Sequence, residues 1–99
     1  MQLCEIVTAA PALQKLILQE LPLPTAWRLS KLISLCNPAL DFYGIQRMKC
    51  RDQNEVEKLM EMDIDMDGFE PVAIAMDDSI RLSAADVKTL EPFVQWEVT

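Results

Sequence analysis

The chain has 99 residues, of which 51% are hydrophobic and 25% charged, and a formal net charge of −7 at pH 7. This length and composition predict a single soluble domain, residues 1–99, with enough apolar side chains for a core. Histidine is absent, which excludes Ser–His and Cys–His nucleophile pairs, and the two glycines cannot form a phosphate-binding loop. No apolar run is long enough to span a membrane.

Residues 5–21 are predicted to form a helix, because a one-sided apolar stripe recurs at helical spacing. The stripe consists of Leu13, Leu16, Ile17 and Leu21. Pro11 suits the first turn of a helix, so the regular helix is expected to begin near Ala10. The prolines of the following LPLPT segment, residues 21–25, predict an extended connector.

A second helix is predicted over residues 25–36, and helical spacing continues beyond Pro38 to about Lys49. Its expected buried face comprises Leu29, Leu32, Ile33 and Cys36, widened by Trp27 and Leu35. Because proline removes a backbone donor inside a helix, we expect a kink at Pro38. The two helices together predict an αα-hairpin over residues 1–50.

The second half of the chain changes its hydrophobic period. Asp52 and Glu55 have capping-box spacing, which predicts a short helix within residues 50–61 that reaches Leu59. Apolar and acidic side chains then alternate strictly over residues 60–67, as in a half-buried strand.

Further signals continue to the end of the chain. They are a turn at Asp67–Gly68, a strand over 72–76 buried on both faces, a turn at 77–79, a short extended piece at 80–82, a helix capped by Ser83 and Asp86 and ended by Pro92, and a closing strand over 93–98. Helices come first and strands mostly later, which predicts an α+β fold with a small antiparallel or mixed sheet and a short C-terminal helix. We expect the strand-rich half, residues 51–99, to share one core with the hairpin.

The stretch MDIDMDG, residues 62–68, matches the start of a calcium-binding EF-hand loop. Its candidate ligands are Asp63, Asp65 and Asp67, followed by Gly68. The twelfth loop position, counted from Asp63, requires a bidentate Glu but holds Ile74, and the segment after the loop is strand-like rather than helical. We therefore predict no metal site and interpret the stretch as a strand with its aspartates in water. Weak cation binding by the three carboxylates remains an alternative.

Charge is unevenly distributed along the chain. Residues 1–51 hold six Lys/Arg against three Asp/Glu, whereas residues 52–99 hold three against thirteen. This asymmetry indicates either complementary solvated faces of one domain, or an acidic surface for a basic partner or for head-to-tail self-association. Direct nucleic-acid binding is disfavoured, because it requires a larger basic patch.

The sulfur-containing side chains allow alternative interpretations. Three cysteines, an odd number without a C-x-x-C pair, suit neither a disulfide framework nor a zinc site. Cys36 is expected in the core, whereas Cys4 and Cys50 suit plain surface thiols, although the neighbours of Cys50, Lys49 and Arg51, would also favour a reactive thiolate. A methionine stripe (Met60, Met62 and Met66) predicts either core packing or an adaptable partner-binding surface.

Several segments together resemble a family of small uncharacterised proteins from phages and prophages of Gram-positive bacteria. The segments are PALQKLILQELPLPTAWRLSKLI, IQRMK, EVEKLMEMDIDMDGFEPVAIAM and IRLSAADVKTLEPFVQWEV. The central CRDQNEVEK is shorter than the charged helix and loop of that family. The resemblance implies phage or prophage origin and expression in the bacterial cytoplasm, in keeping with an N-terminus that lacks a secretory pattern. It implies no activity and no functional residues.

These observations predict a non-enzymatic protein that acts by protein–protein interaction, in virion assembly or host interaction, with self-association among the expected modes. The alternative is an acidic protein that mimics nucleic acid and inhibits a host DNA-binding enzyme. We expect no catalytic, cofactor-binding or metal-binding residues, and neither a membrane nor nucleic acid as a direct partner.

Overall fold

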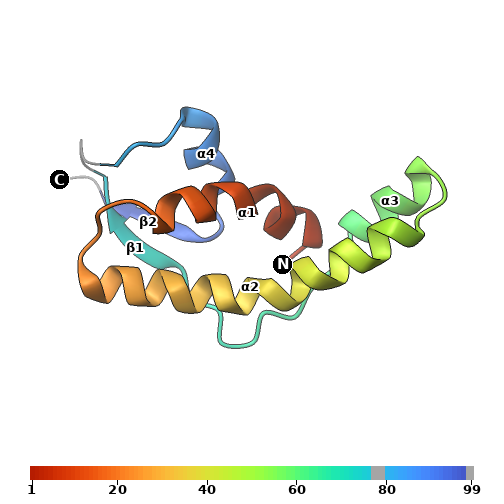
Figure 1. Ribbon diagram of the computed structural model, residues 1–99, viewed down its shortest axis with the longest axis horizontal. Coiled ribbons are helices and arrows are strands. Elements are labelled where there is room, and N and C mark those ends of the chain that lie inside the picture. The colour runs from red at the N-terminus through yellow and green to blue at the C-terminus, as the bar shows by residue number, and fades with distance from the viewer. Residues whose placement is uncertain (77–79, 98–99) are drawn as a thin grey trace.

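The computed structural model describes residues 1–76 and 80–97, which form a helix-rich α+β fold (Figure 1). Its elements are α1 (Leu3–Ile17), α2 (Leu23–Lys49), α3 (Gln53–Met60), β1 (Val72–Ala75), α4 (Ala84–Thr89) and β2 (Val94–Glu97). The molecule is elongated, at 46 × 26 × 18 Å. In Figure 1, α2 runs along its length, α1 lies beside α2, and α3 lies at the end away from the sheet. The predicted N-terminal hairpin followed by a small sheet is confirmed.

Helix α1 begins at Leu3 and contains Pro11, so the predicted start near Ala10 is wrong. Two hydrogen bonds hold the beginning of the chain in place: the Leu3 N–H donates to the Met62 carbonyl at 2.8 Å, and the Ile64 N–H donates to the Met1 carbonyl at 2.7 Å. Buried side chains from Leu3 onward extend the apolar stripe toward the N-terminus. Tertiary packing therefore outweighs the single backbone donor that Pro11 removes.

Helix α2 is continuous from Leu23 to Lys49, which confirms the predicted length. The structure does not show the kink predicted at Pro38. This proline lies on the exposed side of the helix, so water can satisfy the carbonyl that loses its partner, that of Ser34. Pro22 and Pro24 flank the start of the helix, where a missing N–H costs nothing.

Asp52 caps α3, because its side chain accepts from the Glu55 N–H at 2.9 Å. The predicted strand over residues 60–67 is wrong. Met60 ends α3, and the extended segment after it makes one isolated antiparallel bridge, between Gln2 and Asp63. The chain beyond Gln2 turns at once into α1, so no longer ladder can form.

The sheet consists of two parallel strands, so the predicted antiparallel or mixed sheet is wrong. The chain leaves the C-terminal end of β1, passes through α4 and comes back to the N-terminal end of β1, where β2 begins beside it; such a crossover aligns consecutive strands in parallel. Val72 pairs with Val94 and Ile74 with Trp96, on the covered face. Ala75 is exposed, so β1 is buried on one face rather than two. Residues 80–82 form no strand, and the predicted turn at 77–79 and strand end at 98 lie outside the described residues.

The predicted capping box of α4 is confirmed. Ser83 Oγ accepts from the Asp86 N–H at 3.1 Å, and Asp86 Oδ2 accepts from the Ser83 N–H at 3.4 Å. Asp86 Oδ2 also lies 3.1 Å from Lys15 Nζ of α1. The Gln19 side chain, just after α1, donates to the Arg81 carbonyl and accepts from the Arg81 N–H. These contacts fix the crossover against α1.

One apolar core joins residues from both halves of the chain. It comprises Leu3, Ile6, Ala9, Ala12, Leu13, Leu16, Leu29, Leu32, Cys36, Ala39, Leu59, Val72, Ile74, Leu90, Phe93 and Val94. Phe93, fully buried, meets Phe69 edge to face with ring centroids 5.9 Å apart. Helix α1 lies at the centre of this core, and α2 covers it with one side only.

Candidate functional site

The three aspartates of the 62–68 stretch are not gathered around a common point. The Met1 ammonium donates to Asp63 Oδ1 at 2.8 Å, and all three aspartates are exposed. The loop leads into β1, so the second helix of an EF-hand is not formed. Among residues 1–76 and 80–97, no three His, Cys, Asp or Glu side chains lie close enough to hold a metal ion. The alternating burial holds at Ile64 and Met66, which are half-buried, but Met62 is exposed.

The sulfur-containing side chains differ in how deeply they are buried. Met60 and Met66 are half-buried whereas Met62 is exposed, so the predicted methionine stripe does not form one continuous surface. Cys36 lies in the core, as predicted, and burial raises the pKa of its thiol. Cys4 and Cys50 are half-buried free thiols; Cys50 Sγ donates to the Gln46 carbonyl at 3.3 Å.

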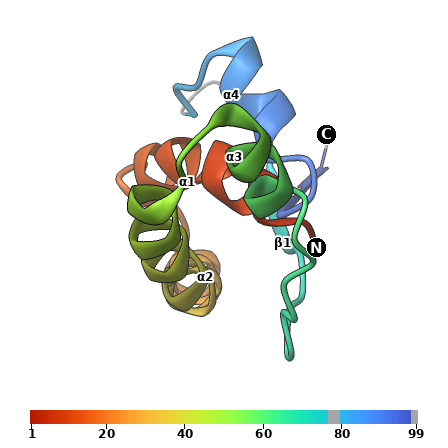
Figure 2. The same ribbon diagram turned by 90° about the vertical axis from the view of Figure 1, so that its right-hand side faces the viewer.

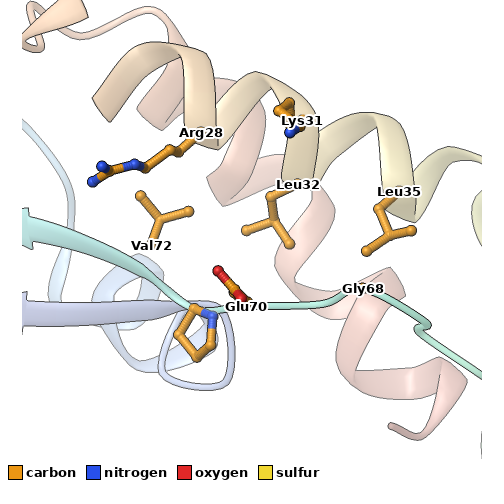
Figure 3. A pocket seen from close by; sticks show the side chains of 8 residues that line it. Arg28, Lys31, Leu32, Leu35, Gly68, Glu70 and Val72 are labelled. Carbon is orange, nitrogen blue, oxygen red and sulfur yellow. The ribbon is translucent and has the colours of Figure 1, made fainter. Parts of the chain in front are cut away.

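A small cavity of about 230 Å³ lies between α2 and the segment that leads into β1 (Figure 3). Figure 3 shows Leu32 and Leu35 pointing from α2 toward this segment, with Arg28 beside Val72 and Glu70 pointing back toward α2. Ligand pockets are usually larger, about 300–1,000 Å³, and more enclosed by aromatic side chains. The cavity is therefore a poor candidate for a small-molecule site.

The most unusual surface belongs to α2. We call it the outer face of α2; its residues are all exposed and follow helical spacing along the side that turns away from the core. They are Leu23, Trp27, Ser30, Lys31, Ser34, Pro38, Asp41, Ile45 and Met48. Figure 2, which looks along the molecule, shows α1 on one side of α2 and no described element on the opposite side. This face is therefore open to solvent along the whole helix.

Large apolar side chains lie near both ends of the outer face. Leu23 is 85% exposed and Trp27 66% at the N-terminal end, and Ile45 is 56% exposed and Met48 89% at the C-terminal end. Isolated exposed apolar side chains are normal on a protein surface, but four on one face of one helix are not. This pattern is typical of an interface that another molecule covers.

Trp27 is the residue that sequence reasoning placed wrongly, because we expected it to widen the buried face. Two residues along a helix turn the side chain by about 200°, so the burial of Leu29 directs Trp27 to the opposite side. The available signal was the spacing of Trp27 and Ile45, which are five full turns apart on a line that does not contain the core residues. Leu35, by contrast, is half-buried as expected.

Beside Trp27 the outer face is hollowed. A shallow depression of about 390 Å³ is formed by α2 alone, lined by Trp27, Ser30, Lys31, Ser34 and Leu35. The two serines are small and leave space between the larger side chains. The lining therefore combines the apolar side chains of Trp27 and Leu35 with the positive charge of Lys31. Such a depression suits a protruding side chain of another protein better than a small ligand.

A second surface is strongly acidic. Between residues 52 and 70 every carboxylate is exposed, and Lys58 is the single basic residue. The carboxylates are Asp52, Glu55, Glu57, Glu61, Asp63, Asp65, Asp67 and Glu70. In the extended part of this segment, alternate side chains lie about 6.6 Å apart, so the charges are closely spaced.

The comparisons with known proteins do not identify a family. No family model, curated protein or solved structure matches the chain. Among the described helices, none has the combination of length and apolar character required to cross a bilayer. Functional inference therefore depends on the surfaces described above.

Proposed function

We propose that this chain is a non-enzymatic protein of phage or prophage type that acts by binding another protein through the outer face of α2. The observation that carries the proposal is the exposure of four large apolar side chains on a single helix face. The chain has no histidine, and the described cavities are small or shallow, which favours binding over catalysis. The phage setting, and with it a role in virion assembly or host interaction, is supported by the family resemblance of the sequence.

Energetics support an interface on this helix. Burial of apolar surface contributes about 25 cal/mol per Å², and tryptophan in particular is enriched among the residues that dominate interface energetics. Leu23, Trp27, Ile45 and Met48 contribute little to the core because they are exposed. Covering them stabilises a complex without a cost to the fold.

The proposal is tested by affinity capture with a tagged chain as bait, against both a lysate of a Gram-positive host and the untagged chain. The decisive variant is Trp27→Ser combined with Met48→Ser. Met76→Ser is the matched control, since Met76 is an exposed methionine outside α2. We expect wild type and control to retain the same protein and the double variant to lose it. Equal retention by all three baits, or no retained protein at all, would contradict the proposal.

The acidic segment supports a second candidate function, inhibition of a host DNA-binding enzyme by mimicry of nucleic acid. The observation that favours it is that all eight carboxylates between residues 52 and 70 are exposed. The test is competition with DNA for a host polymerase or nuclease by wild type and by a variant with Asp63, Asp65 and Asp67 changed to Asn. A control variant with Glu20→Gln, Glu91→Gln and Glu97→Gln removes equal charge at exposed positions outside both surfaces. Competition lost only in the first variant supports mimicry, and absence of competition by wild type rejects it.

A further inference from the structure

We propose that the protein bound by the outer face of α2 is a second copy of this chain, with the two α2 helices antiparallel and a two-fold axis at the level of residue 36. This inference rests on the proposed function and names its partner. Because a two-fold interface is self-complementary, each residue at position i faces the position equally far beyond residue 36 in the other copy. The outer face has this symmetry in its own sequence.

The apolar positions satisfy the symmetry. Trp27 and Ile45 are each nine residues from position 36, so Trp27 of one copy lies at the level of Ile45 of the other. Since 18 residues make five full helical turns, the two side chains project along one line of the helix. Leu23 and Met48 extend the contact at the two ends, thirteen and twelve residues from the axis.

The centre of the face suits close approach of two helices. Ser34 and Pro38 are each two residues from position 36 and face each other across the axis. Both are exposed, and neither carries a long side chain that would hold the helices apart. Cys36 itself points into the core and takes no part.

The charged residues of the outer face are also placed symmetrically about position 36. Lys31 and Asp41 are each five residues from the axis, so two pairs of opposite charge lie at matching levels in the antiparallel arrangement. In a parallel arrangement Lys31 would meet Lys31 and Asp41 would meet Asp41, which is unfavourable. Both side chains are exposed, and neither has an ion-pair partner among the described residues.

The depression beside Trp27 supplies the matching shape. It is lined by residues 27–35, and the antiparallel arrangement places residues 37–45 of the second copy over it. Of these, Pro38, Asp41 and Ile45 are the exposed outer-face side chains. Ile45 of the second copy then lies against Trp27 of the first, and Asp41 of the second copy lies at the level of Lys31 of the first.

The proposed contact is small for a specific interface. A helix of 27 residues is about 40 Å long and presents a strip about 10 Å wide, so the two copies bury about 800 Å² in total, which is less than a standard specific interface and typical of a transient one. We therefore expect a reversible dimer that dissociates on dilution. For a dissociation constant in this weak range, the mass should fall from twice the 11.3 kDa of the chain to the mass of one chain as the protein is diluted from about 1 mM to about 1 μM.

The test is a charge exchange followed by sedimentation of purified protein. Trp27→Lys and Ile45→Glu each place a charge against an apolar side chain at both contacts of a homodimer, so each variant alone should be monomeric. Mixed together they form one Lys–Glu contact and keep one Trp–Ile contact, so the mixture should recover the dimer mass. As a matched control, Trp27→Lys mixed with Met76→Glu adds the same charges but should recover no dimer between the two. Circular dichroism checks that each variant remains folded, as expected for positions 66% and 56% exposed.

The outcomes separate this inference from the proposed function. The antiparallel pair is supported if the wild type is dimeric and if the mixture of Trp27→Lys and Ile45→Glu recovers the dimer mass. A dimer that neither variant weakens, or no recovery in the mixture, would overturn it. Monomeric wild type at every concentration also overturns it, and the proposed function then stands only if capture from the lysate depends on Trp27 and Met48.

Discussion

Helices α1 and α2 use their side chains in opposite ways. Six of the 15 residues of α1 are buried, against four of the 27 residues of α2, and α2 carries four of the large exposed apolar side chains. Helix α1 is thus the centre of the core, in contact with α2, α3 and α4. Helix α2 is longer than the core requires, and its outer face carries large apolar side chains near both ends, where the solvent side of a helix is usually polar. This difference is the basis for our proposal that another molecule covers the outer face of α2.

The largest expected effect compares one residue of each helix. Leu16→Ala in α1 removes a fully buried side chain and should lower the free energy of unfolding by about 2–5 kcal/mol. Met48→Ala in α2 removes a side chain that is 89% exposed and should change it by less than about 0.5 kcal/mol. Urea unfolding at low protein concentration measures both. Comparable losses would show that the outer face belongs to the core after all.

The contact of α1 with α4 can be weakened through the helix cap. Ser83→Ala removes the hydroxyl that accepts from the Asp86 N–H and should cost about 1 kcal/mol. The control is Ser30→Ala, which removes a hydroxyl at an exposed position inside α2. Urea unfolding of the two variants gives the comparison. If Ser30→Ala proves as destabilising as Ser83→Ala, the capping contact has no special role.

Replacing each of the two glycines with alanine should change the free energy of unfolding in opposite directions. Gly44 lies inside α2 with open space around it, so Gly44→Ala should raise the free energy of unfolding by about 0.5–1 kcal/mol. Gly68 has φ +82°, a conformation that is unfavourable for alanine, and Gly68→Ala should lower it by about 1 kcal/mol. Thermal or urea unfolding measures the change in the free energy of unfolding for each variant. A destabilising Gly44→Ala would mean that α2 is not a regular helix at this point.

The smallest effect concerns pH. The hydrogen bond from Lys15 lowers the pKa of Asp86 below its ordinary 3.8, assisted by the contacts with Ser83. Because the folded-state pKa is depressed, the stabilisation is present above pH 3.8 and is lost as the pH falls through the folded-state value. An NMR titration should show the pKa of Asp86 moving up toward 3.8 in Lys15→Met. An unchanged Asp86 titration would show that Lys15 does not hold the α4 cap.

Much of the fold follows from local signals in the sequence. The spacing of Leu29, Leu32 and Cys36 identifies the buried side of α2, and the Ser83 and Asp86 pair identifies the start of α4. The start of α1 was missed because it depends on hydrogen bonds to Met62 and Ile64, about sixty residues away. The relative direction of the two strands was predicted wrongly for a similar reason. It depends on the path of the α4 crossover and not on the residues within the strands.

The candidate site was harder to predict from the sequence than the fold. Sequence reasoning drew attention to the aspartates and methionines of residues 60–67, whereas the exposed apolar face lies on α2. A tryptophan inside a helical stretch normally indicates core, and only the angular position of Trp27 relative to Leu29 shows otherwise. The charge asymmetry of the sequence suggested head-to-tail self-association, which differs from the two-fold pair that we propose and involves other residues.

Oxidative footprinting of methionine tests the central claim most directly, because one molecule contains both the reporter and its control. Met48 lies on the outer face of α2, and Met76 lies outside it; their exposed fractions are 89% and 42%. Oxidation rates follow exposure, so Met48 should react faster than Met76 in dilute protein. As the protein concentration rises, or a captured partner is added, the account predicts that Met48 becomes protected while Met76 does not. A Met48 rate that stays constant relative to Met76 under both conditions would contradict it.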